Sequence, residues 1–181
     1  MIIYRFVFLL LLIFITANLY AQEFNTLVTD EETGEPMLIG RTTRDAFNDS
    51  SFSLWWNSTY NLYKVDSVTA DDLKDVIKDI DITIVMGTWC SDSQYEIPNL
   101  YKIFDYLVYP TERITLINVD RDKNGEGNEL DRLKIELVPT IIFYKDEKEL
   151  GRIVETPNDS LEKDILKILT GDKDADKNKK E

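Results

Sequence analysis

Short apolar runs alternate with amphipathic helical segments from residue 67 to residue 169, and this order restricts the fold more than any other feature of the sequence. The runs at 82–86 and 114–119 are rich in β-branched residues, as in strands that are covered on both faces. Segments 140–144 and 149–154 flank the polar run Asp146-Glu147-Lys148, which indicates an antiparallel hairpin. Helical stripes precede, separate and follow these strands. The sequence therefore predicts an α/β fold in which helices flank a central mixed β-sheet.

Capping patterns predict where the first and last of these helices begin. Thr69 is followed three residues later by Asp72, and Asp159 is followed in the same way by Glu162. Such pairs satisfy backbone N–H groups that a first helical turn leaves unpaired. We therefore expect one helix to begin at Thr69 and the last helix to begin at Asp159. Residues 130–137 predict at most a short helix.

The first 21 residues have the order of a secretory signal peptide. Arg5 supplies a positive charge, residues 6–17 are mostly Phe, Leu and Ile, and Ala21 places a small residue before the polar sequence. We expect cleavage near Ala21 and export to the periplasm or the medium. An uncleaved anchor is the alternative, and only in that case do we expect an association with a membrane.

The rest of the chain divides into three parts. Residues 22–66 form an N-terminal extension. Its aromatic side chains fit both helical and alternating spacing, so the pattern does not decide between a helix and a strand for the aromatic segment. Residues 67–170 carry the regular α/β pattern. Residues 171–181 contain no apolar side chain larger than that of Ala175 and predict a disordered, charged tail. We expect the aromatic segment from Phe47 to Tyr63 to pack on the α/β domain as an added helix.

Composition limits the chemistry that the chain can perform. It has no histidine and a single cysteine, Cys90. Zinc sites of the Cys/His type, Ser-His and Cys-His nucleophilic pairs and an intramolecular disulfide are therefore excluded. The 34 Asp and Glu residues outnumber the 21 Lys and Arg residues, for a formal net charge of −13. This balance argues against binding to nucleic acid, which requires basic surfaces.

One loop resembles part of a calcium-binding motif. Asp120, Asp122 and Asn124 alternate ahead of Gly125, and Asp131 falls at the twelfth position of the motif. The calcium loop follows a helix and ends in a bidentate glutamate, whereas this segment follows a strand and ends in aspartate. We therefore prefer a solvated loop without metal and keep calcium as the alternative.

A set of motifs in fixed order resembles the thioredoxin family over about residues 69–169. The run Trp89-Cys90-Ser91-Asp92-Ser93 lies where a strand passes into a helix, like the Trp-Cys-x-x-Cys motif of that family. Pro98 matches the proline that kinks the family's active-site helix, and Val138-Pro139-Thr140 matches its cis-proline loop. Gly151 matches a glycine of its last strand. The pattern is similar to that of secreted, single-cysteine (CxxS-type) thioredoxin-like proteins of Bacteroidetes-like bacteria.

This resemblance implies a thioredoxin-like fold and a site for thiol–disulfide exchange. Cys90 would be the nucleophile, and Pro139, in the cis form, would hold its loop against the sulfur so that the Val138 backbone pairs with a bound peptide. Thr140 continues that loop. The implied partners are disulfide- or thiol-containing proteins or small thiols, and no cofactor is implied. Two departures stand out, because Ser93 replaces the second cysteine and Ile84 replaces the buried acid of the family.

The residues of the motif predict how one thiol would work. A helix N-terminus favours the thiolate of Cys90, and we expect the Ser93 hydroxyl to donate a hydrogen bond to the sulfur. Asp92 opposes the thiolate modestly, whereas Trp89 packs and shields the site. Since no second thiol exists, a mixed disulfide would be resolved by a substrate thiol, as in an isomerase, or by an external thiol. The alternative is a redox-inactive, peptide-binding module in which Cys90 is inert.

Overall fold

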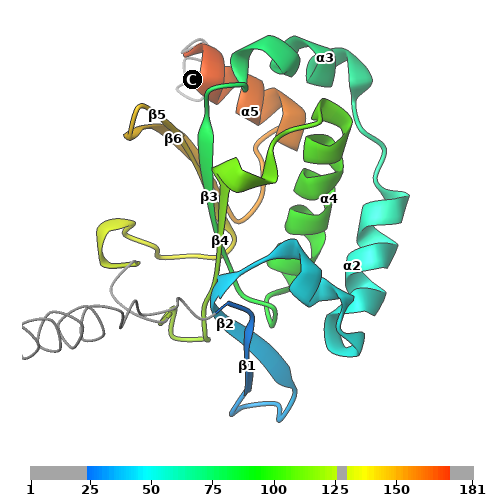
Figure 1. The fold of residues 1–181 in the computed structure, drawn as a ribbon, viewed down its shortest axis with the longest axis vertical. Coiled ribbons are helices and arrows are strands. Elements are labelled where there is room, and N and C mark those ends of the chain that lie inside the picture. Colours follow the sequence, from blue (N-terminus) through cyan, green and yellow to red (C-terminus); the bar gives the residue numbers. More distant parts are fainter. Residues whose placement is uncertain (1–23, 126–129, 172–181) are drawn as a thin grey trace, which may run out of the picture.

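A computed structural model describes residues 24–125 and 130–171 of the chain. Its centre is a six-stranded sheet with the order β1-β2-β4-β3-β5-β6 (Figure 1). Only β3 and β4 pair in parallel, and every other neighbouring pair is antiparallel. The prediction of a mixed sheet is therefore confirmed. The strands are β1 (Thr26–Thr29), β2 (Pro36–Thr42), β3 (Asp81–Met86), β4 (Ile114–Asn118), β5 (Thr140–Lys145) and β6 (Lys148–Val154).

Four α-helices pack beside this sheet: α2 (Ser50–Leu62), α3 (Ser67–Val76), α4 (Ser91–Leu107) and α5 (Leu161–Thr170) (Figure 1). Ile82, Ile84 and Met86 alternate along β3 and join the large apolar core that contains the buried side chains of all four helices. This is the period of two that one strand face requires. None of the described helices is long and apolar enough to cross a membrane.

A smaller apolar cluster lies on the opposite side of the sheet. Val85, Ile117, Val119 and Val138 are buried there, and the partly buried Leu130, Leu133 and Ile135 pack against them. The prediction of at most a short helix in this region is confirmed, since only the 3₁₀-helix η3 (Leu130–Arg132) forms within residues 130–137. A loop segment rather than an α-helix therefore covers this face, and it ends at the Val138–Pro139 peptide.

The N-terminal extension contributes strands as well as a helix. The sequence predicts no regular element ahead of the aromatic segment, yet β1 and β2 form a hairpin, and β2 pairs antiparallel with β4 through Gly40 and Asn118. Burial alternates along β2 from Leu38 to Thr42, but the buried positions after Leu38 hold Gly40 and Thr42, so the strand lacks the apolar alternation by which it would be recognised. The sheet of the α/β domain thus continues into residues 22–66.

The aromatic segment of the extension forms the short 3₁₀-helix η1 (Arg44–Asn48) and helix α2, as expected for an added helix. Asp49 caps α2 by accepting a hydrogen bond from the Ser51 amide. The rings of Phe47 and Trp56 stack at 4.1 Å, and Trp56 contacts Tyr101 of α4 at 5.4 Å between centroids. These large apolar surfaces join the extension to the core of the domain.

Both predicted helix starts are wrong, by three residues at the first helix and by one residue at the last. Helix α3 is capped by Asp66, whose carboxylate accepts from the amide and the hydroxyl of Thr69. Helix α5 is capped by Ser160, which accepts from the Lys163 amide. Glu162 is instead buried and accepts from the Tyr63 hydroxyl and the Asp66 amide. A tertiary contact therefore overrides the local capping pattern.

Two sequence predictions lie wholly or largely outside the described residues. The signal peptide at 1–21 is one of them. The charged tail at 171–181 is the other, apart from Gly171, which ends α5 with a φ of 69°.

The aromatic contacts of α2 predict a large effect on stability. Trp56→Ala should lower the free energy of unfolding by about 3–5 kcal/mol, because it removes a buried indole between Phe47 and Tyr101. Urea unfolding followed by circular dichroism measures this change. Leu54→Ala on the same helix is the matched control, since Leu54 is 82% exposed and its loss should change stability by less than about 0.5 kcal/mol. Equal effects of the two substitutions would contradict the packing of α2 on the core.

Candidate functional site

Cys90 lies at the point where strand β3 passes into helix α4. The Cys90 amide donates to the Gly87 carbonyl at 3.0 Å, which closes a tight turn after the strand. Cys90 is the N-cap residue of α4, and its carbonyl accepts from the Gln94 amide. The side chain is half-buried and forms no disulfide. The side chain of Cys90 makes no capping hydrogen bond, and the residue stands at a helix start, where unpaired N–H groups stabilise a nearby negative charge.

The loop around the cis peptide forms the other side of the site. The Val138–Pro139 bond is cis, and Val138, Pro139 and Thr140 are all buried. The Cys90 thiol donates a hydrogen bond to the Val138 carbonyl oxygen at 3.2 Å. The Thr140 hydroxyl donates to the Leu137 carbonyl at 2.7 Å and holds the loop from its far end. Two segments 48 residues apart in the sequence thus meet at the sulfur.

Ser93 does not serve the sulfur as predicted. Its side chain is fully buried, and its hydroxyl oxygen accepts a hydrogen bond from the Gly87 amide at 3.3 Å. Among the contacts of the described residues, none joins Ser93 to Cys90. The rotamer that reaches back to the turn satisfies a buried amide. Ser93 therefore closes the turn at Gly87, while Ser91 is exposed and Asp92 is half-buried in the first turn of α4.

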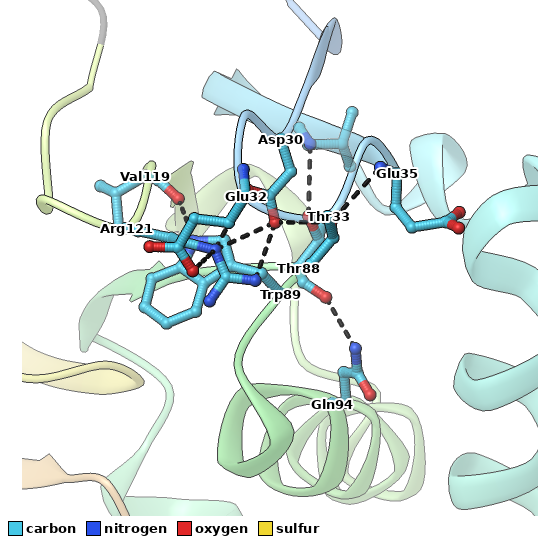
Figure 2. Close-up of polar contacts among 10 residues, drawn as sticks. Asp30, Glu32, Thr33, Glu35, Thr88, Trp89, Gln94, Val119 and Arg121 are labelled. Atoms are coloured by element: carbon cyan, nitrogen blue, oxygen red, sulfur yellow. Dashed lines mark hydrogen bonds and ion pairs between the residues drawn. The ribbon is translucent and has the colours of Figure 1, made fainter.

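Trp89 is held from several sides (Figure 2). Its indole N–H donates to the Val119 carbonyl at 2.9 Å, and the guanidinium of Arg121 lies 5.2 Å from the ring centroid. The ring also lies over Gly87, where an added Cβ would come within 2.5 Å of the indole. Only glycine fits at this position, so the turn at Gly87 and the placement of the tryptophan depend on each other.

Arg121 connects the tryptophan to the N-terminal hairpin. It binds the carboxylate of Asp30 through Nε and through Nη2, the latter at 2.8 Å (Figure 2). Asp30 also accepts from the Glu32 amide and the Thr33 hydroxyl, and it is only 3% exposed. The hydrogen bonds from Arg121 are the main reason that the pKa of Asp30 falls to about 2. Asp30 and Arg121 therefore form an ion pair throughout the neutral range.

The hairpin also contacts the site loop directly. The Leu38 amide of β2 donates to the Thr88 hydroxyl at 3.3 Å, and Gln94 of α4 donates to the Thr88 carbonyl at 2.7 Å. Arg121, Asp30, Thr88 and Gln94 were not among the residues predicted for the site. Asp30 and Arg121 are 91 residues apart, and nothing in the sequence pattern pairs them.

Ile84 stands at the place of the family's buried acid, and its apolar side chain is fully buried in the core. A different acid is buried on α4. Glu96 is 6% exposed, and burial, with a smaller contribution from the Asp92 carboxylate, raises its pKa to about 7.

The calcium alternative finds no support in the geometry of its loop. Both carboxylate oxygens of Asp120 accept from Asn124, and Arg121 turns toward Asp30. Within the described ranges, no group of three or more acidic or cysteine side chains is arranged to hold a metal ion. Residues 126–129 of the motif lie outside those ranges.

Comparisons with known proteins agree with this geometry. Residues 61–167, more than half of the chain, match the family model named Thioredoxin, and the chain therefore belongs to the thioredoxin family. No curated protein sequence matches it.

Several solved structures are similar to the chain. A protein of unknown function from Pseudomonas aeruginosa is 18% identical with a TM-score of 0.48, and the match covers 66% of this chain and 82% of that one. Mitochondrial thioredoxin 3 from Saccharomyces cerevisiae is 17% identical with a TM-score of 0.36, covering 56% and 88%. Thioredoxin from Fasciola hepatica is 20% identical with a TM-score of 0.36, covering 56% and 92%.

Glu96 predicts an unusual dependence of stability on pH. Its pKa is raised from 4.5 to about 7 on folding, so the folded state binds more protons than the unfolded state between these values. Stability is therefore highest below pH 4.5 as far as this group is concerned, and it falls as the pH rises through 7. Between pH 5.5 and 8.5 the free energy of unfolding should drop by about 2 kcal/mol on account of Glu96.

Urea unfolding at a series of pH values measures this loss. Glu96→Gln is the matched variant, because it keeps the shape of the side chain and cannot ionise. It should flatten the profile above pH 5.5 relative to the wild type. A wild-type profile that stays level or rises from pH 5.5 to 8.5 and that Glu96→Gln does not change would contradict the assignment.

Proposed function

We propose that this protein is an exported thiol–disulfide oxidoreductase that acts through the single nucleophilic thiol of Cys90. The observation that carries the proposal is the position of the sulfur. It lies at the N-terminus of α4 and within 3.2 Å of the loop that begins with the cis Val138–Pro139 peptide. The first element stabilises a thiolate, and the second offers backbone groups to a bound cysteine peptide. Family membership is consistent with this chemistry.

The proposed step is an exchange of disulfides. The Cys90 thiolate attacks one sulfur of a substrate disulfide, a new S–S bond forms, and the old S–S bond breaks. The second substrate sulfur leaves as a thiolate and takes a proton from solvent. No net electrons enter or leave at this stage, since one disulfide replaces another.

Resolution requires a thiol from elsewhere. Ser93 occupies the place of the second cysteine and is fully buried, so this chain cannot release the adduct by itself. Attack by another thiol of the substrate gives isomerisation, and attack by a small thiol or a partner protein gives reduction. Both routes regenerate free Cys90.

A second candidate function is a redox-inactive, peptide-binding module. It is favoured by the absence of an acid at Ile84 and by the Cys90–Val138 hydrogen bond, which belongs to a protonated thiol. The rate of iodoacetamide alkylation at neutral pH separates the two functions. A catalytic Cys90 should react faster than free cysteine, whereas an inert one should react at the same rate or more slowly.

The site of action is also part of the proposal. The apolar segment at 6–17 and Ala21 support export with cleavage after Ala21. Intact mass measurement of the protein recovered from the periplasm or medium should then give a chain that begins at Gln22. A chain recovered in membranes with residues 1–21 intact would instead support the anchor.

Substitutions at the two ends of the motif test the mechanism. Wild-type protein should accumulate in cells as covalent mixed disulfides, because no internal thiol resolves them. Cys90→Ser should abolish these adducts and preserve the fold, since serine is accepted at an N-cap. Ser93→Cys should shorten the life of the adducts and raise the reduction of insulin disulfides. The gain should be incomplete, because Ile84 provides no proton acceptor for the new thiol.

Ser91→Cys is the matched control for the second substitution. It adds a thiol to the same motif, but at the exposed first residue of α4, directly next to Cys90 in the chain. It should raise insulin reduction far less than Ser93→Cys does. A non-reducing gel with free monomer only, together with no gain for Ser93→Cys, would overturn the redox function.

A further inference from the structure

The turn of the β1–β2 hairpin, residues 30–35, binds Arg121 in the segment after β4, and Arg121 lies against Trp89, the residue before Cys90 (Figure 2). The proposed exchange chemistry uses none of the residues that make this contact. Asp30 is nevertheless almost fully buried and paired, which is a costly arrangement for a carboxylate unless its partners are held in place.

The carboxylate of Asp30 is fixed from the side of the hairpin. Its oxygens accept from the Glu32 amide at 3.1 Å and from the Thr33 hydroxyl at 3.0 Å. The Asp30 amide and carbonyl pair with Glu35 and Gly34 across the same turn. The hydrogen bonds within the hairpin turn thus fix the orientation in which the Asp30 carboxylate binds a cation.

Arg121 contacts the Asp30 carboxylate on one side and the Trp89 indole on the other. Nε and Nη2 both donate to Asp30, so the plane of the guanidinium is determined by two hydrogen bonds rather than one. The same group lies 5.2 Å from the Trp89 ring centroid, within the range of a cation–π contact. A lysine at this position would keep the charge and lose the planar contact.

Trp89 has little freedom on its other sides. Its N–H is bound to the Val119 carbonyl, and its ring closes over Gly87, the residue whose carbonyl accepts from the Cys90 amide. Movement of the indole would therefore disturb the turn that places Cys90 at the start of α4. The sulfur is useful only at that place, because the stabilisation by the helix N-terminus falls off within the first turn.

We propose that Arg121, locked by Asp30, is a positioning residue that holds Trp89 and thereby keeps the Cys90 sulfur at the N-terminus of α4. The proposal rests on the proposed function, since it concerns the reactivity of the same thiol. It gives the N-terminal extension a role in the site as well as in the core.

The rate at which Cys90 forms a mixed disulfide with the uncharged probe 2-hydroxyethyl disulfide tests the proposal. Intact mass follows this reaction in the purified, folded protein and does not require turnover of a protein substrate. Arg121→Gln and Asp30→Asn should both slow this reaction, by about tenfold, because each removes one partner of the Asp30–Arg121 pair that holds Trp89. Arg121→Lys should fall between Arg121→Gln and the wild type.

The direction of the two changes separates positioning from a simple effect of charge. If Arg121 acted only by its positive charge near the thiolate, Arg121→Gln would slow the reaction. Asp30→Asn would then accelerate it, because the buried carboxylate that pairs with that charge would be gone and the exposed Glu32, 3.2 Å from Nε, would pair with it alone. Rates that change in opposite directions would overturn the proposal, and rates that fall together support it.

A double substitution shows whether the effect passes through the indole. Trp89→Phe should itself slow the reaction, and Arg121→Gln should then add less than about a twofold change in the Trp89→Phe background. A loss of general stability would not give this result, since its effect on the rate would persist in both backgrounds. Full additivity would overturn the proposal, and the Arg121 and Trp89 variants remain decisive if Asp30→Asn fails to fold.

Arg113→Gln is the matched control. Arg113 pairs with Asp81 at 3.0 Å at the opposite ends of the same two strands, β3 and β4, roughly 17 Å away along a strand of five residues. It should leave the rate within about twofold of the wild type. An equal loss for Arg113→Gln and Arg121→Gln would overturn the proposal. If the Arg121 and Asp30 variants react slowly but the wild-type protein forms no adducts in cells, the positioning role is supported and the proposed function is overturned.

Discussion

The parallel pairing of β3 with β4 is the contact on which the site depends. Parallel strands end at the same edge of a sheet, so the segments that follow β3 and β4 are brought side by side although 30 residues separate Trp89 from Val119. The Val119 amide continues the ladder by donating to the Met86 carbonyl at 2.9 Å. Cys90 leaves one strand and Arg121 leaves the other. The remaining contacts of the site adjust the positions of two segments that the sheet has already brought side by side.

The hairpin and the cis-peptide loop approach this edge from opposite sides. Asp30 and Leu38 reach Arg121 and Thr88 from the N-terminal extension, whereas Val138 reaches Cys90 from the segment before β5. The contacts of Leu38 and Val138 are hydrogen bonds between backbone and side chain, and the contact of Asp30 with Arg121 is an ion pair between side chains. Together they hold loops that a packed core alone would leave free. The extension is thus a structural part of the thioredoxin-family domain, with its helix in the core and its hairpin at the site.

The sequence was most informative where local pattern and burial coincide. The runs at 82–86, 114–119, 140–144 and 149–154 became β3 to β6 with ends shifted by at most a few residues, because alternation and β-branching reflect covered strands directly. The hairpin of β1 and β2 was missed because the buried face of β2 continues from Leu38 through Gly40 and Thr42, which are not apolar side chains. Ser93 was assigned to the sulfur because sequence spacing does not determine a rotamer. The Asp30–Arg121 pair depends on a tertiary contact that no local pattern encodes.

The Val138 carbonyl has a consequence for the order of events at the site. In the free protein this oxygen is occupied by the Cys90 thiol, so the acceptor that would align a peptide backbone is engaged by the nucleophile itself. Loss of the thiol proton removes the only donor in that contact and leaves two electron-rich atoms facing each other. Loss of the thiol proton therefore activates the sulfur and frees the Val138 carbonyl oxygen in the same step. In the proposed exchange, the protein would become able to hold a peptide at the moment when its sulfur becomes able to attack the disulfide of that peptide.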